Sequence, residues 1–207
     1  MTTGVRRRAP KQAAEVRRET IVDAAIRVFA RTSYRAAGTA EIAREAGIAE
    51  PTIYRHFDSK RELYLAALAR CGDIVRDEFA RIAGATPEAH VALEAMGQWY
   101  AHAMETDPEY LRLRLRALAE TDDEDVRATV HETYAGILAT ITEVIRRGQA
   151  QGCINREITP EGGAWLFMSI GHTMDLARLI GQAPDEYDRG CHGMVEVAKR
   201  ALMADPA

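Results

Sequence analysis

Residues 39–60, TAEIAREAGIAEPTIYRHFDSK, decide the fold of this chain. Their spacing predicts two short helices joined by a tight turn, followed by the start of another helix. Gly47 suits the turn, because glycine readily adopts the positive φ that a connection of three or four residues needs. Pro51 stands where the second helix would begin, since its fixed φ matches the first helical position. The stretch therefore has the order of a helix-turn-helix.

The two sides of these helices differ in chemistry. Ile42 and Ala43 form the inward face of the first helix, and Ile53 and Phe57, four residues apart, anchor the second. The second helix leaves polar side chains outward: Thr52, Arg55 and His56. A short helix of this kind, with two cations directly after it at positions 60 and 61, is shaped to enter the major groove of DNA. A plain surface hairpin is the alternative, but the proline, the polar face and the cations together favour DNA binding.

The same stretch resembles the DNA-binding region of tetracycline-repressor-like (TetR family) transcriptional regulators. The positions that carry the resemblance are Val28-Phe29, Ile42-Ala43, Ala46-Gly47, Tyr54, Phe57, Lys60 and Leu63. The match extends from Arg17 to Leu68, and beyond it only the helical layout is similar. The resemblance implies an all-α fold, in which a three-helix DNA-binding domain precedes a larger helical domain for effector binding and dimerisation.

The resemblance also implies which residues meet DNA. Four would hold phosphates: Thr39, Tyr54, His56 and Lys60. Four would face bases: Glu50, Pro51, Thr52 and Arg55. Arg55 is the best candidate for reading guanine, a contact worth about 1–3 kcal/mol of discrimination. Glu50 departs from the neutral or basic residues common at its position, and it would either accept a hydrogen bond from cytosine N4 or weaken non-specific binding.

Length and charge divide the 207 residues into parts with different partners. We expect a flexible basic arm (1–14), a helix-turn-helix domain (15–61) and a C-terminal effector-binding and dimerisation domain (62–207). Residues 1–61 contain 13 Lys and Arg against 7 Asp and Glu, whereas residues 62–207 contain 14 against 24. A basic N-terminal part on an acidic body is expected when only one end of a protein meets phosphate. The arm would be a solvated tail or a segment that reaches the DNA backbone or a minor groove.

Caps and prolines predict nine helices and no strand. The first would span 17–31. The fourth would be capped by Asp58 or Ser59, with Glu62 in a capping box with Ser59, and would end before Gly84. The starts expected for the last five helices are Thr86-Pro87, Asp107-Pro108, Asp122-Asp123, Thr159-Pro160 and Asp185. No stretch shows the alternation of a strand. The expected fold class is therefore all-α.

The sequence contains no signature of catalysis, cofactor or metal. It lacks the G-x-S-x-G, HExxH, P-loop and dinucleotide-binding patterns, so we expect neither an enzyme nor a cofactor. His172 and Asp175 share one helical face, but a third ligand at suitable spacing is missing, so a hydrogen-bonded pair in a pocket or in the core is favoured over metal ligation. The longest apolar run, 164–170, is too short to span a membrane, and the cysteines form no CxxC pair. A cytoplasmic location without membrane attachment is expected.

Bulky side chains recur on helix faces of the larger domain, where Met and aromatic residues could line an adaptable apolar cavity. These candidates for an effector pocket are Met96, Trp99, Tyr100, Met104, Tyr110, Leu115, Tyr134, Trp165, Met168 and His172. Plain core packing is the alternative for each. Arg112, Arg114 and Arg116 alternate along one short helix, so we expect them at the solvated surface. By resemblance, the effector would be a small apolar or amphipathic molecule.

Glycine and other small residues are frequent in the last two helices. Interior glycines destabilise a helix by about 1 kcal/mol each relative to alanine, so a packing reason is expected for them. Close approach of helices across a two-fold interface or within the monomer would supply it. The resemblance implies a homodimer that pairs through these two helices and binds a palindromic operator.

Three functional hypotheses follow. The first is a ligand-responsive transcriptional regulator, most often a repressor, whose effector moves the long fourth helix and with it the DNA-binding helices. The second is a constitutive DNA-binding regulator whose larger domain only dimerises. The third is an enzyme or carrier that happens to contain a helical hairpin. The helix-turn-helix residues favour the first two.

Overall fold

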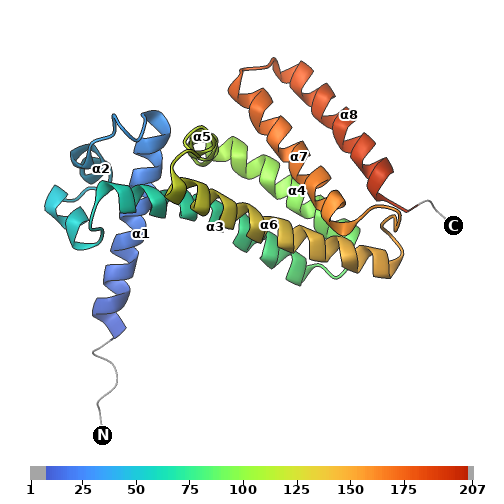
Figure 1. Ribbon diagram of the computed structural model, residues 1–207, viewed down its shortest axis with the longest axis horizontal. Coiled ribbons are helices and arrows are strands. Elements are labelled where there is room, and N and C mark those ends of the chain that lie inside the picture. The colour runs from blue at the N-terminus through green and yellow to red at the C-terminus, as the bar shows by residue number, and fades with distance from the viewer. Residues whose placement is uncertain (1–7, 205–207) are drawn as a thin grey trace, which may run out of the picture. The chain divides into compact units, whose positions relative to one another are not determined.

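The computed structural model describes residues 8–204 (Figure 1). Its helices are α1 (Arg8–Arg31), α2 (Thr39–Glu45), η1 (Glu50–Arg55), α3 (Lys60–Ala85), α4 (Ala89–Thr106), α5 (Pro108–Leu118), α6 (Glu124–Gln151), α7 (Pro160–Leu179) and α8 (Pro184–Leu202). Over this range eight elements are α-helices and η1 is a 3₁₀ helix, and no β-strand is present. The backbones of Ile154 and Met203 form an isolated antiparallel bridge. The prediction of an all-α fold is confirmed.

Helix α1 begins at Arg8, whereas the apolar pattern predicted a start at Arg17. Residues 13–20 are exposed, so packing against a core does not explain the extra turns. The segment is rich in Ala, Gln, Glu and Arg, which favour helix even at the surface. The C-terminal part of the expected basic arm (1–14) is therefore helical, and residues 1–7 lie outside the described residues.

The second helix of the helix-turn-helix is shorter and tighter than expected. Its spacing predicted a helix that ends at Phe57, but η1 is a 3₁₀ helix that ends at Arg55. The His56 N–H donates to the carbonyl of Ile53 at 2.9 Å, three residues back, as 3₁₀ winding requires. Ile53 and Phe57 are nevertheless both buried, so the predicted anchors of this helix are confirmed.

Helix starts follow the predicted caps where the cap is local. Ser59 Oγ accepts from the Glu62 N–H at 3.1 Å, so the expected cap of α3 is present, and Thr159 caps α7. The predicted start at Thr86-Pro87 is wrong, because α4 begins at Ala89. Its N-cap residue, Glu88, makes no side-chain capping bond, and the Ala89 N–H is instead capped by the side chain of Gln151, whose Oε1 accepts at 2.9 Å. A cap supplied from 62 residues away is invisible to local spacing.

The chain divides into two compact units. The N-terminal unit consists of Met1–Cys71 and Arg112–Val130, and the C-terminal unit consists of Gly72–Leu111 and His131–Ala207. Helices α3, α5 and α6 each contribute residues to both units. The domain boundary that we predicted after Arg61 stays a prediction, since α3 continues through it.

The core of the N-terminal unit lies where α1 meets the helix-turn-helix and the start of α3. Phe29, Ile42, Ile53 and Leu63 are all at most 1% exposed. The ring of Phe29 contacts that of Tyr64 edge to face, with centroids 5.0 Å apart. This core fixes the helix-turn-helix on two long helices, so that its polar face is presented on a rigid base.

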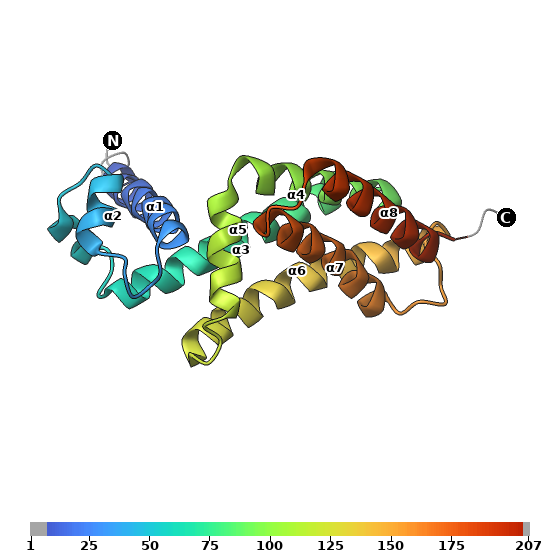
Figure 2. The same ribbon diagram turned by 90° about the horizontal axis from the view of Figure 1, so that it is seen from above.

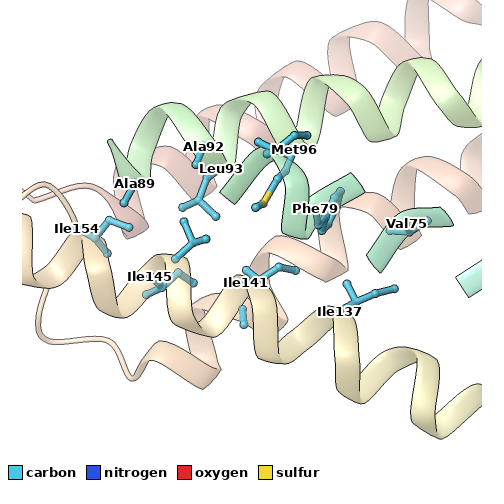
Figure 3. Packing of buried hydrophobic residues seen from close by; sticks show 13 residues of the cluster. Val75, Phe79, Ala89, Ala92, Leu93, Met96, Ile137, Ile141, Ile145 and Ile154 are labelled. Carbon is cyan, nitrogen blue, oxygen red and sulfur yellow. The ribbon is translucent and has the colours of Figure 1, made fainter. Parts of the chain in front are cut away.

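The core of the C-terminal unit is formed by apolar residues of α3, α4 and α6 (Figure 3). Phe79 lies inside this cluster, and edge-to-face contacts join its ring to Trp99, Tyr100 and Phe167, with centroids 6.0 to 6.5 Å apart. Helices α7 and α8 lie side by side (Figure 2). The unit is thus a bundle with an aromatic centre.

Candidate nucleic-acid interface

Helix α2 and η1 are held in place by a turn and by two arginines. Gly47 has a φ of 67°, which confirms the positive φ that the turn required. Glu45, at the end of α2, accepts from Arg27 Nε and Arg31 Nη2, both at 2.7 Å. The hydrogen bonds from Arg31 and Arg27 lower the pKa of Glu45, so its carboxylate stays charged. These bonds tie the C-terminal end of α2 to α1.

Three of the predicted DNA contacts form one hydrogen-bonded group. Thr39 Oγ1 donates to Glu50 Oε1 at 2.5 Å, and it lies 3.1 Å from the hydroxyl of Tyr54. Tyr54 is 51% exposed, which is unusual for so large a ring, while Thr39 and Glu50 are half-buried. The structure therefore brings a predicted base-facing acid together with two predicted phosphate ligands.

The outer face of η1 carries the other predicted base contacts. Pro51 and Arg55 are exposed, and Thr52 is half-buried. Arg55 Nη2 donates to Thr52 Oγ1 at 3.0 Å, so the guanidinium is steered by its neighbour. Its remaining N–H groups can still meet the N7 and O6 acceptors of guanine.

Lys60 and His56 are less free than the sequence suggested. The Lys60 ammonium lies 4.7 Å from the ring centroid of Tyr34 and donates to the carbonyl of Arg35 at 3.5 Å. His56 is half-buried. Tyr34 was absent from our predicted site, although an aromatic residue in the connection after α1 is a recognisable signal for positioning a cation.

Sequence reasoning also missed the contribution of the α5–α6 segment to the N-terminal unit. Arg61 makes a bidentate pair with Asp123, at 2.7 Å for both bonds, and it also bonds Asp125. The guanidinium of Arg61 and the backbone N–H of Val126 lower the pKa of Asp123 to about 2. Arg61 and Asp123 lie 62 positions apart in the sequence, so no local pattern predicts that they pair.

Two further hydrogen bonds join this segment to the helix-turn-helix core. Tyr64 donates to Glu120 Oε2 at 2.5 Å. The pKa of Tyr64 is raised mainly by burial and further by this hydrogen bond. Arg116 donates to the carbonyl of Phe29 at 3.2 Å. Arg116 is exposed, as its place at the solvated surface predicted, and its guanidinium also reaches a backbone acceptor on α1.

The predicted effector-pocket residues fall into several environments. Met96 and Met104 are buried, while Trp99 and Tyr100 pack around Phe79. Trp165 is 56% exposed. The candidates that are half-buried are Trp99, Tyr100, Tyr110, Leu115, Tyr134, Met168 and His172. Leu115 belongs to the N-terminal unit, and the other nine belong to the C-terminal unit.

Two tyrosines bond the polar pair on α7 that the sequence singled out. The ring of Tyr134 stacks on that of His172 at 5.4 Å, and the Tyr134 hydroxyl lies 2.7 Å from His172 Nε2. Tyr100 donates to Asp175 Oδ2 at 2.5 Å, and Asp175 is fully buried. Asp175 is therefore hydrogen-bonded to a tyrosine of α4, and His172 to a tyrosine of α6. Hydrogen bonding is the role that the sequence favoured for these two residues over metal ligation.

Within residues 8–204, no group of three or more His, Cys, Asp or Glu side chains is arranged to hold a metal ion. Over the same residues, every helix is too short or too polar to cross a membrane.

Comparison with known proteins finds one sequence family that matches the helix-turn-helix region. Residues 21–67 match the sequence profile of bacterial regulatory proteins of the tetR family. The chain is 36% identical over 110 residues to the HTH-type transcriptional activator FasR of Mycolicibacterium smegmatis, which covers 53% of this chain and 50% of FasR. It is 33% identical over 111 residues to the HTH-type transcriptional repressor KstR of Rhodococcus jostii, covering 51% of this chain and 49% of KstR. The chain thus spans about half the length of these two relatives, which are regulators and not enzymes.

The fold is similar over almost the whole chain to a solved regulator. A transcriptional regulator from Saccharomonospora viridis, in complex with choline, superposes with a TM-score of 0.78 at 21% identity and covers 91% of this chain and 98% of its own. At this identity the similarity concerns the fold. One relative is named an activator and the other a repressor, so the direction of regulation varies among similar proteins.

Proposed function

Because residues 21–67 match the sequence profile of bacterial regulatory proteins of the tetR family, we propose that this chain is a homodimeric transcriptional regulator of that family that binds a palindromic operator in the cytoplasm. The observation that carries the proposal is the polar outer face of η1 on a fully buried base. Arg55 and Thr52 lie on this face, and Ile53 and Phe57 anchor it from below. Rigid support of this kind positions side chains for base contacts.

The proposed DNA contacts divide by role. Thr39, Tyr54, His56 and Lys60 hold phosphates, and the base contacts are Glu50, Pro51, Thr52 and Arg55. In a two-fold dimer the two η1 helices meet half-sites about one helical turn apart. Phosphate contacts give affinity and salt dependence, while base contacts give sequence preference.

The proposed partner of α7 is a second copy of this chain. Trp165 and Leu176 on α7 and Ile180, the C-cap of α7, are 56%, 57% and 70% exposed, and their spacing places them along one side of this helix. The hydroxyls of Ser169 and Thr173, between them, donate to the carbonyls of their own helix. These hydroxyls therefore already have acceptors within α7, and the face offers mainly apolar contacts. Such a face is suited to the core of an interface between identical subunits.

The proposed effector site lies among the tyrosine-bonded side chains of the C-terminal unit. Tyr100, Tyr134, His172 and Asp175 supply polar groups beside apolar residues, the composition of a site for a small amphipathic molecule. Binding there would change operator affinity through α3, α5 and α6, because these helices contribute to both units. A coupling of about 1–3 kcal/mol changes affinity about 5- to 150-fold.

Two substitutions test the DNA-binding proposal. Arg55→Ala should lower affinity for the preferred duplex by about tenfold and relax base preference at one position, since one bidentate base contact is lost. Lys60→Ala should weaken all duplexes alike and reduce the slope of log affinity against log salt concentration by about one. Fluorescence anisotropy with a duplex that this protein enriches from a random pool measures both. An unchanged affinity in both variants contradicts the proposal.

A constitutive regulator is the alternative for the C-terminal unit. Tryptophan fluorescence can be titrated with choline and with other amphipathic molecules, and operator affinity is then measured with each ligand that binds. Tyr134→Phe and His172→Leu should weaken ligand binding while leaving operator affinity of the free protein unchanged. Operator affinity that is the same with and without saturating ligand favours the constitutive alternative.

A further inference from the structure

The carboxylate of Glu50 is joined by hydrogen bonds to the hydroxyl groups of Thr39 and Tyr54, which the proposed function assigns to phosphates. Thr39 Oγ1 donates to Glu50 Oε1 at 2.5 Å. A threonine hydroxyl has one proton, so in its 3.1 Å contact with Tyr54 the tyrosine must be the donor. The hydrogen bonds therefore run in one direction, from Tyr54 to Thr39 to Glu50.

This direction has a consequence for DNA binding. Both hydroxyl protons are directed along this chain of hydrogen bonds toward a negative charge, whereas phosphate oxygens accept hydrogen bonds and need donors that are directed at the DNA. The carboxylate also repels the phosphates that would approach Thr39 and Tyr54. Glu50 thus takes the place of a phosphate as the acceptor for the hydroxyl groups of Thr39 and Tyr54.

Glu50 opens η1, next to the exposed Pro51. In helix-turn-helix proteins the N-terminal residues of the second helix contact base edges. At that place a carboxylate can accept a hydrogen bond from an exocyclic amine in the major groove, N4 of cytosine or N6 of adenine. The same side chain can therefore turn from Thr39 to a base.

We infer that Glu50 is a specificity-determining residue that makes the release of the Thr39 and Tyr54 hydroxyls conditional on a base amine. On DNA that offers an amine at this position, the carboxylate turns to the base and both hydroxyls bind phosphate. On other DNA the carboxylate keeps the hydroxyls, and two phosphate contacts are lost. The inference rests on the proposed function, since it assumes that η1 enters the major groove.

The test compares two duplexes by fluorescence anisotropy with the intact protein. One is the duplex that the wild-type protein enriches from a random pool, and the other is a scrambled duplex of the same composition. Glu50→Gln should bind the scrambled duplex about tenfold more tightly, the scale of one charge-assisted hydrogen bond, and bind the enriched duplex no more tightly. Glu41→Gln is the matched control, because it removes one negative charge from α2 and should keep the ratio of the two affinities.

A second variant tests the competition itself. Thr39→Val should change affinity for the scrambled duplex by less than about twofold in the wild-type protein, because Glu50 already holds the hydroxyl. In the Glu50→Gln background the same change should weaken binding several-fold. Circular dichroism confirms that each variant is folded.

The base is identified by placing each of the four bases at the contacted position of the enriched duplex. Loss of preference for cytosine alone, or for adenine alone, in Glu50→Ala names the amine that is recognised, because glutamine would still accept a hydrogen bond from adenine N6. The inference is overturned if Glu50→Gln and Glu41→Gln shift both duplexes by equal factors, or if Thr39→Val has the same effect in both backgrounds. Failure of the wild-type protein to enrich any sequence contradicts the proposed function instead, and the Thr39→Val comparison in the two backgrounds, repeated on a duplex of arbitrary sequence, still tests the competition.

Discussion

The helix-turn-helix and helix α7 expose opposite kinds of surface. Around α2 and η1 the apolar anchors Ile53 and Phe57 are at most 1% exposed, and the outer face consists of hydroxyl, carboxylate and guanidinium groups. On α7 and its C-cap the large exposed side chains are apolar, with Trp165 at 56% and Ile180 at 70%. The apolar residues beneath the first surface are buried by the protein itself, and the surface offers polar contacts to a partner. The second leaves apolar area uncovered, which is expected of a surface that a further subunit buries.

The two units also differ in what holds them together. The N-terminal unit combines a small core with charged pairs between distant residues, such as Arg61 with Asp123. The C-terminal unit depends on an aromatic centre around Phe79. The difference indicates that the first unit is sensitive to charge and pH, and the second to the volume of its buried side chains.

The largest effect is expected from the aromatic centre of the C-terminal unit. Phe79→Ala removes a fully buried ring and should lower the free energy of unfolding by about 3–5 kcal/mol. Tyr54→Ala removes a similar ring that is 51% exposed in the N-terminal unit and should lower it by less than about 1 kcal/mol. Urea denaturation followed by circular dichroism measures both. Equal losses would contradict the assignment of Phe79 to a buried core and of Tyr54 to an exposed polar surface.

The next effect concerns the apolar face of α7. Ile180→Glu places a charge in the proposed interface, so the protein should become monomeric and lose about 100-fold in operator affinity, because two half-sites are no longer bound together. Val91→Glu is the control, since Val91 is also an exposed apolar residue, at 41%, but lies on α4. Sedimentation velocity measures the oligomeric state. A dimer that survives Ile180→Glu would place the interface elsewhere.

A smaller effect is expected where two helices of the C-terminal unit approach closely. A Cβ at Gly72 would lie 2.2 Å from the side chain of Thr133, so Gly72→Ala should destabilise the protein by about 1–3 kcal/mol. Gly84→Ala on the same helix meets no atom within 4 Å and should be neutral or slightly stabilising. Thermal unfolding of the two variants distinguishes close packing from a general intolerance of alanine in α3.

The smallest effect tests the charged attachment in the N-terminal unit. The pKa of Asp123 is lowered by Arg61 from an ordinary value of 3.8 to about 2, so its contribution is present above pH 4 and is lost as the pH falls toward 2. The urea midpoint of the wild-type protein should therefore drop over this range more than that of Asp123→Asn. Asp122→Asn alters the neighbouring carboxyl group and should behave like the wild-type protein. Identical pH profiles for all three proteins would show that the pair does not stabilise the fold.

The sequence predicted the helix-turn-helix well because its signals are local. The positive φ of Gly47, the anchors Ile53 and Phe57, and the cap at Ser59 all depend on residues within a few positions of one another. Features that depend on contacts between residues far apart in the sequence were not predicted. The start of α4 depends on Gln151, and the attachment of the α5–α6 segment depends on Arg61.

The sequence by itself determined that this chain is all-α and that η1 has a buried and a polar side, because both follow from periodicity and backbone preference. Only the tertiary structure decided what the polar groups do. Thr39, Glu50 and Tyr54 meet although 11 and 15 positions separate them, and Tyr100 reaches Asp175 across 75. Such pairs depend on how helices pack against one another, and helix packing is set by the whole core rather than by the spacing of any one segment.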